Sequence, residues 1–490
     1  MNDVTVAGFP LVAARALAGG TWRESERTTE IRDPYRGSVV GTAPISSAAD
    51  LDAALSAAVG ACDKAAALPG YERAALLRRI AVLIERDIKG LAELMTRETG
   101  KALKDSEGEI RRSLETFQLA AEEAIRIEGR HVPLDGSAMG AGRMAFLMRF
   151  PVGVVAAITP WNYPLNQIAL KVAPALAAGC TVVLKPSEIA PFNAFILAEV
   201  IEAAGLPKGV FNLVTGYGPT VGEALVNHPQ VDMISFTGST RAGKRISELA
   251  AQTVKRVALE LGGKSASVVL DDADLAAAVK STVNMCYLNS GQTCTALTRM
   301  LVPESKYEEA AKIAAEVAKA FTPGDPLSET TRLGPLSSQM QLERVRGYIR
   351  KGVAEGAELL TGGAEAPEGV PAGGYYVKPT VFGKVKPGST IEQEEIFGPV
   401  LSIVTYKDEE DAIRIANGTV YGLAGAVWSK DEQRAQKVAR RIRAGQVDVN
   451  GGAFNMMAPF GGFKQSGHGR EAGVYGLEEF LEYKSLQLKG

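Results

Sequence analysis

The sequence has few of the residues that build disulfide frameworks or histidine metal sites. Its four cysteines (Cys62, Cys180, Cys286 and Cys294) lie far apart with no C-x-x-C pair, and only three histidines occur in 490 residues. This distribution fits neither a disulfide scaffold nor a zinc site, so no bound metal is expected. Dispersed cysteines are typical of chains that fold under reducing conditions, which predicts a cytoplasmic location.

Long apolar runs and an excess of one charge are also missing. No hydrophobic stretch approaches the roughly 20 residues that a membrane-spanning helix needs. The 54 basic and 56 acidic residues nearly balance, which argues against nucleic acid or an anionic membrane as a partner. With 46% hydrophobic and 22% charged residues, the composition is that of a globular protein, and the length allows two or three domains.

The pattern of the chain changes near residue 150. Residues 49–129 are rich in Ala, Glu, Leu and Arg, with apolar residues every three or four positions, which predicts amphipathic helices. Beyond residue 150, short apolar runs such as VGVVAAIT, TVVLK and VDMISFTG alternate with helical segments. This alternation predicts a parallel sheet with crossover helices, and a second such region extends from Ser265 to about residue 440.

The stretch GSTRAGKR at 238–245 matches the phosphate-binding loop of nucleotide triphosphatases up to its last position. Arg245 stands where those enzymes have the hydroxyl that ligates Mg²⁺. Because VVLDD at 268–272 resembles their second acidic motif, an NTP-dependent enzyme stays an alternative. A strand, a glycine turn and a helix start fit the pyrophosphate of a dinucleotide better. The fingerprint G-x-G-x-x-G is absent, and its nearest approach is GYGPTVG at 216–222.

A lone cysteine is most often a small buried hydrophobe. That interpretation is kept for Cys62, Cys180 and Cys286, which lie within helical or strand patterns. Cys294 differs because it follows a glycine-bearing turn in NSGQTCTALTR, with hydroxyl residues on either side. A thiol on such a turn can be activated as a thiolate and attack a carbonyl carbon.

Two polar residues elsewhere suit a partner role for this nucleophile. Glu260 ends the apolar run of VALELGGKS, where it is either a solubilising residue at a sheet end or a general base for water. Asn162 in ITPWNYP either stabilises its own turn or donates to a developing oxyanion. Lys185 and Glu188 in TVVLKPSE are spaced to face one ribose, and EEIFGPV offers a carboxylate and a ring for a second one.

Seven motifs together resemble the aldehyde dehydrogenase superfamily in order and spacing, over nearly the whole chain: ITPWNYP, LKPSE, FTGSTRAG, LELGGKS, NSGQTC, EEIFGPV and APFGGFKQSG. The resemblance implies that Cys294 is the nucleophile, Glu260 the general base and Asn162 an oxyanion donor. It implies an α/β fold with a Rossmann-like dinucleotide-binding domain, an α/β catalytic domain and a small β oligomerisation arm. The expected bounds are 1–130 and 151–262 for the NAD-binding domain, 263–440 for the catalytic domain, and 131–150 and 441–490 for bridging and oligomerisation segments.

The resemblance also implies a nicotinamide dinucleotide cofactor. Lys185 and Glu188 are expected at the adenine ribose, and Glu395 and Phe397 at the nicotinamide ribose. A carboxylate at 188 favours NAD because it would repel a 2′-phosphate, while Lys185 and Ser187 leave NADP as an alternative. The full set of expected cofactor contacts is Thr159, Trp161, Lys185, Ser187, Glu188, Gly218, Gly222, Thr237, Gly238, Ser239, Leu261, Glu395 and Phe397.

The expected reaction is oxidation of an aldehyde to the carboxylic acid through a thiohemiacetal and a thioester on Cys294, and Glu260 favours hydrolysis over transfer to coenzyme A. Relatives that act on succinate semialdehyde carry an Arg where this chain has Leu170, so an uncharged aliphatic or aromatic aldehyde is predicted as the substrate. A semialdehyde dehydrogenase for an acidic substrate remains an alternative. The expected pocket residues are Tyr163, Leu170, Leu288, Phe454, Met457 and Phe460.

The family further implies a homodimer or homotetramer. FLEYKSLQL at 480–488 alternates like an edge strand that seeks a partner. A catalytically silent binding protein on the same fold is a further alternative, which the intact Cys294, Glu260 and Asn162 oppose.

Overall fold

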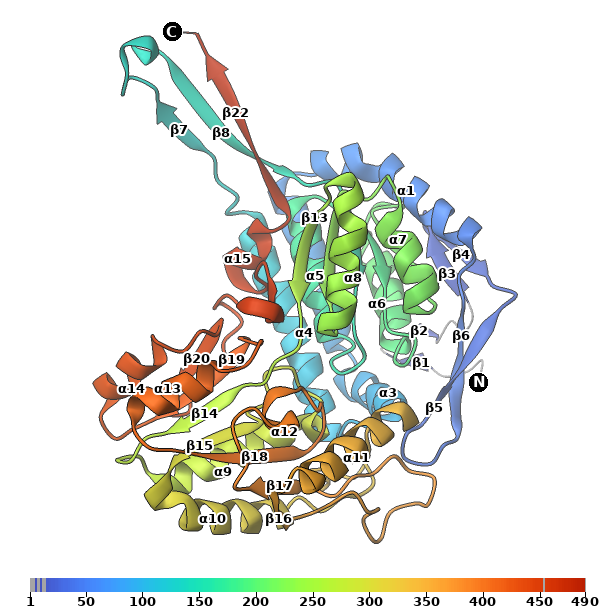
Figure 1. The fold of residues 1–490 in the computed structure, drawn as a ribbon. Coiled ribbons are helices and arrows are strands. Elements are labelled where there is room, and N and C mark those ends of the chain that lie inside the picture. Colours follow the sequence, from blue (N-terminus) through green and yellow to red (C-terminus); the bar gives the residue numbers. More distant parts are fainter. Residues whose placement is uncertain (1–4, 7–8, 11–14, 453, 490) are drawn as a thin grey trace.

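The larger lobe is built on an eight-stranded sheet whose five central strands run parallel (Figure 1). The structure, a computed structural model, describes residues 5–6, 9–10, 15–452 and 454–489. The central strands are short, rich in Val, Ile and Ala, and almost entirely buried, as parallel strands covered on both faces are. The strand order is β21 (Gly467–His468), β13 (Arg256–Glu260), β12 (Met233–Thr237), β9 (Val154–Ile158), β10 (Thr181–Lys185), β11 (Phe211–Leu213), β3 (Arg15–Ala18) and β4 (Thr21–Glu24).

Helices cover both faces of this sheet because its side chains alternate between them. Val155 and Ala157 of β9 pack into one core, and Val154, Ala156 and Ile158 pack into the other. The first core is closed by α2 (Gly70–Glu85), α3 (Ile88–Thr99), α4 (Leu103–Ala124), α5 (Asn166–Ala178) and α6 (Phe192–Ala203). The second is closed by α1 (Ala48–Ala67), α7 (Glu223–Asn227) and α8 (Thr240–Ala250).

The smaller lobe has a seven-stranded sheet that is parallel except for β16 at one edge. Its order is β16 (Glu358–Thr361), β17 (Thr380–Gly383), β18 (Val400–Tyr406), β15 (Arg299–Pro303), β14 (Ala266–Val269), β19 (Ala424–Trp428) and β20 (Gln446–Val449). One face packs on α9 (Leu275–Tyr287) and α10 (Tyr307–Lys319). The other packs on α11 (Gln339–Ala354), α12 (Thr390–Gln393), α13 (Glu409–Asn417) and α14 (Glu432–Ala439).

A three-stranded antiparallel arm projects from the larger lobe (Figure 1). It consists of β22 (Leu481–Leu488), β8 (Met144–Pro151) and β7 (Arg130–Pro133), and α15 (Gly473–Glu478) lies at its base. The alternating segment at 480–488 thus forms a strand, as predicted, and pairs with β8 along its whole length. Two small hairpins complete the fold: β1 (Thr5–Val6) with β2 (Phe9–Pro10), and β5 (Thr28–Arg32) with β6 (Val39–Pro44).

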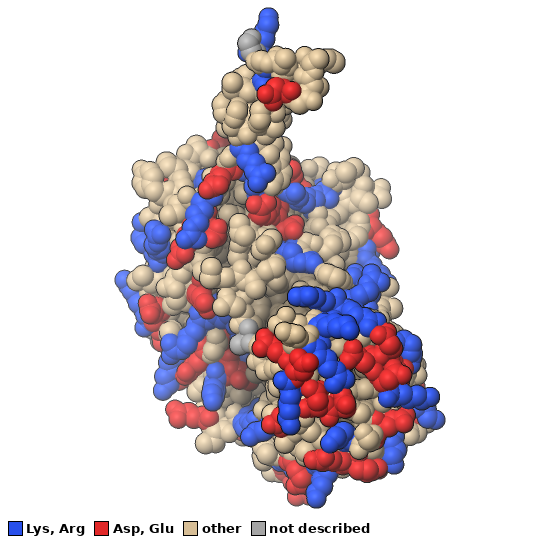
Figure 2. Space-filling model, turned by 90° about the vertical axis from the view of Figure 1, so that its left-hand side faces the viewer, with Lys and Arg blue, Asp and Glu red and all other residues tan. Residues whose placement is uncertain are grey.

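The predicted fold class is confirmed, with a Rossmann-like lobe, a second α/β lobe and a β arm. The segment beyond residue 440 places β20 in the small sheet, β21 in the large sheet and β22 in the arm. Among the described residues no helix is long and apolar enough to cross a membrane. Figure 2 shows basic and acidic side chains interspersed over one face of the molecule, as the balanced composition predicts.

Candidate active site

The carboxyl ends of four adjacent parallel strands gather four of the predicted site residues. Thr159 follows β9, while Lys185, Thr237 and Glu260 are the last residues of β10, β12 and β13. All four are at most 7% exposed. This edge of a doubly wound sheet is where such folds bind dinucleotides. The Oγ1 atom of Thr159 has no hydrogen-bond partner within the described protein, which leaves it free for a ligand.

The loop that resembles a phosphate-binding loop connects β12 to the N-terminus of α8. Ser239 caps this helix by accepting a hydrogen bond from the Ala242 backbone N–H at 3.2 Å. Gly243 allows the helix to approach the sheet, since a Cβ there would lie 2.6 Å from Leu261. Arg245 forms a bidentate ion pair with Glu223 at 3.1 and 2.9 Å. Its side chain therefore lies on the protein surface and contacts α7 instead of the loop.

Cys294, the predicted nucleophile, lies on a backbone-strained loop between α9 and β15. Asn289 and Ser290 have positive φ angles of 52° and 55°, followed by Gly291 at 73°. Such conformations are costly for residues other than glycine and are concentrated at functional sites. Gly263 allows the strand-end loop to touch the nucleophile, because a Cβ there would lie 2.4 Å from the Cys294 carbonyl oxygen. Gly263 thus brings the end of β13 up to the loop that contains Cys294, and Gly262 leaves room for the Glu395 carboxylate.

Asn162 is held directly against this loop. Its Nδ2 donates to the Gln292 carbonyl at 3.0 Å, and the Asn289 amide donates back to the Asn162 carbonyl at 2.9 Å. The next residue, Tyr163, shares a hydrogen bond of 3.0 Å with the Thr293 hydroxyl. Asn162 is 5% exposed, and its amide nitrogen, which carries two hydrogens, donates one hydrogen bond within the described protein.

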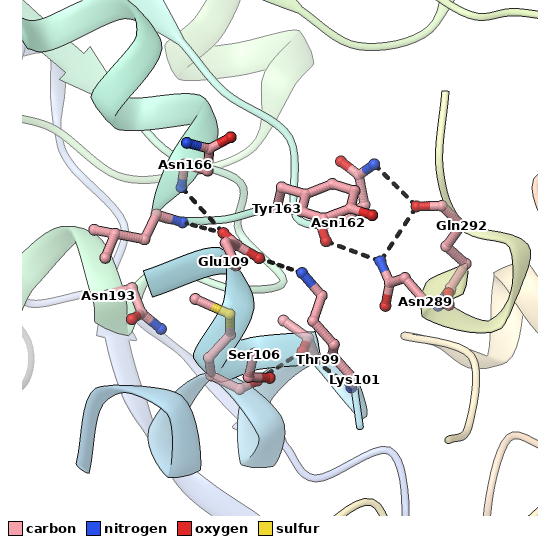
Figure 3. A network of polar contacts seen from close by, with 12 residues as sticks. Thr99, Lys101, Ser106, Glu109, Asn162, Tyr163, Asn166, Asn193, Asn289 and Gln292 are labelled. Atoms are coloured by element: carbon pink, nitrogen blue, oxygen red, sulfur yellow. Dashed lines mark hydrogen bonds and ion pairs between the residues drawn. The ribbon is translucent and has the colours of Figure 1, made fainter. Parts of the chain in front are cut away.

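A buried ion pair supports the segment that carries Asn162 (Figure 3). Lys101 and Glu109 form an ion pair and both side chains are fully buried. Glu109 also accepts hydrogen bonds from the backbone N–H groups of Leu165 (2.9 Å) and Asn166 (3.0 Å) at the start of α5. The Lys101 ammonium lies 3.9 Å from the centre of the Tyr163 ring. Sequence reasoning missed this pair, although a carboxylate within the buried stripe of α4 was its visible signal.

The Glu260 carboxyl has no hydrogen-bond partner for either oxygen within the described protein, although the residue is only 3% exposed. Burial raises its pKa well above the usual range, and the Glu471 carboxylate adds to the shift. The Lys171 ammonium opposes it; Lys171 pairs with Glu471 and donates to Thr237 Oγ1 at 2.6 Å. A carboxyl with a raised pKa is suited to accept and release protons near neutral pH.

The Cys294 thiol is partly exposed at the wall of a cavity. Desolvation raises the pKa of this thiol well above its ordinary value, and repulsion from Glu260 and Glu395 adds to the shift. The raised pKa favours the protonated thiol at rest, so the activation to a thiolate that the sequence predicts needs a proton acceptor. Attack on a carbonyl then requires a base that takes the proton, and Glu260 is one of the carboxylates acting on the thiol.

The remaining predicted cofactor residues line up along the same edge. Lys185 Nζ is 3.6 Å from Glu188 Oε2, and the Gly222 position lies beside the Lys185 stem. On the other side, the Trp161 and Phe397 rings meet edge to face with centroids 5.5 Å apart. Ser187 accepts from the Ile189 N–H, Gly218 begins the turn that ends at Gly222, Gly238 precedes the α8 cap, and Leu261 donates its backbone N–H to Ser466.

Glu395 extends this row towards the nucleophile. Its Oε1 accepts from the Gly263 N–H at 3.0 Å, and a Cβ on Gly262 would lie 2.3 Å from its other oxygen. Burial raises the pKa of this carboxyl, which the hydrogen bond from Gly263 opposes. A glycine-lined edge with a free hydroxyl, a lysine and two carboxylates fits the hydroxyls and pyrophosphate of a dinucleotide.

A cavity of about 350 Å³ leads to Cys294. Five of the six predicted pocket residues line it: Tyr163, Leu170, Leu288, Phe454 and Phe460. Met457 is 66% exposed and lies outside this lining. The lining also includes Arg112, Asp448 and Trp428, which sequence reasoning missed because no local motif marks them. The described residues hold no cluster of three or more His, Cys, Asp or Glu that would bind a metal.

Fold and site together are those of an oxidoreductase that has a dinucleotide-binding sheet edge and a cysteine in the adjoining cavity. The model of the aldehyde dehydrogenase family matches residues 22–486. The chain is 47% identical to a 3-succinoylsemialdehyde-pyridine dehydrogenase from Pseudomonas sp, over 95% of this chain and 97% of the relative. The chain belongs to the aldehyde dehydrogenase family. This assignment does not support the NTP-dependent alternative, and the ion pair of Arg245 with Glu223 agrees with that outcome.

Two solved structures show the same fold. Aldehyde dehydrogenase C from Pseudomonas syringae, a mutant bound to NAD⁺ and octanal, is 42% identical with a TM-score of 0.94, covering 99% of this chain and 98% of that one. Betaine aldehyde dehydrogenase from Staphylococcus aureus, bound to NAD⁺, is 37% identical with a TM-score of 0.94, covering 97% and 94%. The predicted enzyme class, an oxidoreductase that acts on aldehydes, is therefore confirmed.

Proposed function

We propose that this enzyme oxidises an uncharged aldehyde to its carboxylic acid with NAD, through a thiohemiacetal and a thioester on Cys294. The observation that carries the proposal is the meeting of three groups from different elements. Asn162 donates to the carbonyl of Gln292, two residues before Cys294, and Gly263, three residues after Glu260, lies against the Cys294 carbonyl. A nucleophile, a base and an oxyanion donor in one place are the parts that acyl chemistry requires.

Attack begins when Glu260 takes the proton of the Cys294 thiol and the sulfur bonds to the aldehyde carbon. The oxygen of the aldehyde gains negative charge, which the Asn162 amide and the Cys294 backbone N–H stabilise by donating hydrogen bonds. NAD, when bound, would supply the acceptor for the hydride that leaves the same carbon, and a thioester on Cys294 would remain. Glu260 then releases the thiol proton to solvent and removes a proton from a water molecule that attacks the thioester. The bond to sulfur breaks to release the acid, and Glu260 returns its proton to the Cys294 thiolate.

The residues proposed to bind the cofactor lie at the carboxyl edge of the large sheet and in the loops beside it. Lys185 and Glu188 would hold the adenine ribose, Ser239 at the α8 N-terminus the pyrophosphate, and Glu395 with Phe397 the second ribose. Glu188 supports NAD over NADP because its carboxylate accepts from ribose hydroxyls and repels a phosphate. The solved relatives bound to NAD⁺ support the same choice.

An uncharged substrate is supported by Leu170 and by the apolar residues of the cavity. The octanal in the Pseudomonas syringae structure is an uncharged aldehyde, and the Pseudomonas relative is named for a semialdehyde that carries a pyridine. A homodimer or homotetramer assembled through the β arm belongs to the same proposal, as do the expected domain bounds. The four free cysteines support a reducing, cytoplasmic setting.

The test is NADH formation when the protein is mixed with NAD and an aldehyde such as hexanal. Each NADH should be matched by one equivalent of carboxylic acid, without added coenzyme A. The reaction should persist in EDTA, since the proposed mechanism needs no metal ion. Absence of NADH with every aldehyde tried, or loss of NAD binding on chelation, would contradict the proposal.

A further inference from the structure

The cavity that leads to Cys294 contains two charged side chains, and they come from different lobes. Arg112 lies on α4 of the large lobe, and Asp448 lies on β20 of the small lobe. Both side chains line the cavity, and within the described part of the chain no ion pair joins them. The rest of the lining is mainly apolar or small, which gives these two groups the main electrostatic influence on a bound tail.

Arg112 is the only arginine or lysine in this lining among the described residues. Its guanidinium lies 5.7 Å from the centre of the Tyr163 ring, and within the described protein no carboxylate forms an ion pair with it. The Tyr163 hydroxyl is hydrogen-bonded to Thr293, the neighbour of Cys294. Tyr163 therefore contacts both Arg112 and the loop that contains Cys294. A guanidinium has five N–H donors, and an aromatic face satisfies none of them as a hydrogen-bond acceptor would.

Asp448 opposes this cation with a carboxylate that is held in place. The Gln446 side-chain amide, which also lines the cavity, donates to Asp448 Oδ1 at 2.9 Å. Burial raises the pKa of the Asp448 carboxyl, and the hydrogen bond from Gln446 opposes that shift by favouring the ionised form. A substrate carboxylate in the cavity would lose its hydration and be repelled by Asp448, which cancels part of the attraction of Arg112.

We propose that Arg112 and Asp448 determine the substrate tail: Arg112 donates hydrogen bonds to an uncharged acceptor, such as a carbonyl or ring nitrogen, and Asp448 excludes tails that end in a carboxylate. An uncharged acceptor gains a charge-assisted hydrogen bond without the cost of desolvating an anion. Apolar residues such as Leu170 and Phe460 then contact the stem between the aldehyde and this acceptor. This inference rests on the proposed aldehyde oxidation and names its substrate class.

Three aldehydes with the same two-carbon stem test it: pentanal, levulinaldehyde and succinic semialdehyde. They place an ethyl group, a methyl ketone or a carboxylate at the same distance from the aldehyde. The measurement is kcat/KM from NADH formation with saturating NAD. The wild type should prefer levulinaldehyde to pentanal by about tenfold or more, the usual worth of a hydrogen bond to a charged group. Succinic semialdehyde should be the poorest of the three.

Substitutions should change these ratios in opposite ways. In Arg112→Met the preference for levulinaldehyde over pentanal should disappear, and Arg112→Lys should retain part of it. In Asp448→Asn the ratio of succinic semialdehyde to pentanal should rise about tenfold or more, since a repelling charge is lost. Arg111→Met, an exposed neighbour on α4, is the matched control and should keep the wild-type ratios.

Two results would overturn the inference. An equal loss for all three aldehydes in Arg112→Met would make Arg112 a structural residue, with melting temperatures showing whether folding is the cause. A wild-type preference for succinic semialdehyde that Arg112→Met abolishes would make the natural tail a carboxylate. Failure of the proposed function is distinguishable, because it would leave the wild type without NADH formation from any of the three.

Discussion

The carboxyl of Glu260 and the thiol of Cys294 both have raised pKa values because each would ionise in a poorly hydrated site among other carboxylates. Ionising one makes it harder to ionise the other, since two negative charges at short range repel strongly in low dielectric. The first of the two groups to ionise therefore raises the pKa of the other still further. In the proposed mechanism Glu260 accepts the thiol proton first and later acts as a base for water.

Cys294→Ala should abolish aldehyde oxidation while NAD still binds. The thiol acts on substrate, and the dinucleotide edge is formed by other residues. The loss of kcat should exceed about a hundredfold, equivalent to roughly 3 kcal/mol of transition-state stabilisation. Steady-state NADH formation and calorimetric titration with NAD measure the two effects. Cys62→Ala, on α1, is the control, and a Cys294→Ala enzyme that retains more than a hundredth of kcat would show that the nucleophile is another group.

Glu260→Gln should separate the two halves of the reaction. Gln keeps the shape of the side chain but cannot accept a proton from water, so hydrolysis of the thioester slows by about 10²–10⁴-fold. Rapid mixing should then show a burst of NADH close to one equivalent per site, followed by slow turnover. Mass spectrometry of the quenched protein should find the acyl group on the peptide with Cys294. An unchanged steady-state rate would remove Glu260 from the mechanism.

The raised pKa of Glu260 should also link stability to pH with a definite sign. Its folded pKa lies above its unfolded one, so the folded protein binds the extra proton and loses stability as the pH rises from the ordinary Glu range through the raised value. The Glu260→Gln variant has no titrating carboxyl at this position, so it lacks this pH-dependent loss of stability. Urea unfolding across that range should show wild-type stability falling relative to the variant, whereas activity rises as the base ionises. A pH-independent difference would contradict the assigned shift.

At the scale of elements, the Lys101–Glu109 pair fixes the start of α5 and with it the Asn162 turn. Glu109→Ala should lower the free energy of unfolding by about 3–5 kcal/mol, because it leaves a buried ammonium without its partner. Glu115→Ala, exposed on the same helix, should change it by less than about 0.5 kcal/mol. Urea denaturation measures both. A small effect at Glu109 would mean that water enters and solvates Lys101.

The same pair is expected to act on catalysis through Asn162. Glu109→Gln keeps an acceptor for the α5 backbone but removes the charge that holds Lys101 against Tyr163. If its loss of kcat arises from a displaced Asn162, Glu109→Gln should cost little more in an Asn162→Ala background. Additive losses would instead indicate a general structural role.

Elements and local motifs could be predicted from the sequence because their signals are short in range. Short apolar runs predicted the parallel strands, VALELGG marked Glu260 at the end of a strand, and NSGQTC marked Cys294 on a loop. What could not be predicted depends on contacts between distant segments. Leu170, in place of an arginine, predicted a cavity that has no cation. Arg112 nevertheless lines this cavity, because α4 packs beside α5 and no local motif reveals that contact. Met457 lies in the expected segment yet is largely exposed, because the turn containing it directs it away from the cavity lining.

At the scale of the whole molecule, the β arm leaves apolar side chains in solvent. Phe146 and Met148 on β8 are 40% and 42% exposed, and Leu486 on β22 is 49% exposed. Figure 2 shows few charged side chains on the arm compared with the lobes below it. A thin three-stranded sheet with exposed apolar residues and open edges is typical of a surface that pairs with a second subunit. The arm is therefore the expected oligomer contact.

Phe146 and Leu486 face each other across the β8–β22 ladder, which allows a selective test. Replacing them together by Phe146→Glu and Leu486→Lys removes the apolar surface but places opposite charges side by side, which keeps the two strands compatible. Light scattering after size-exclusion chromatography should then show a smaller assembly than the wild type. Gln487→Glu, on the opposite face of β22, is the control and should leave the mass unchanged. An unaltered mass in the double variant, with circular dichroism showing an intact fold, would place the subunit contact elsewhere on the molecule.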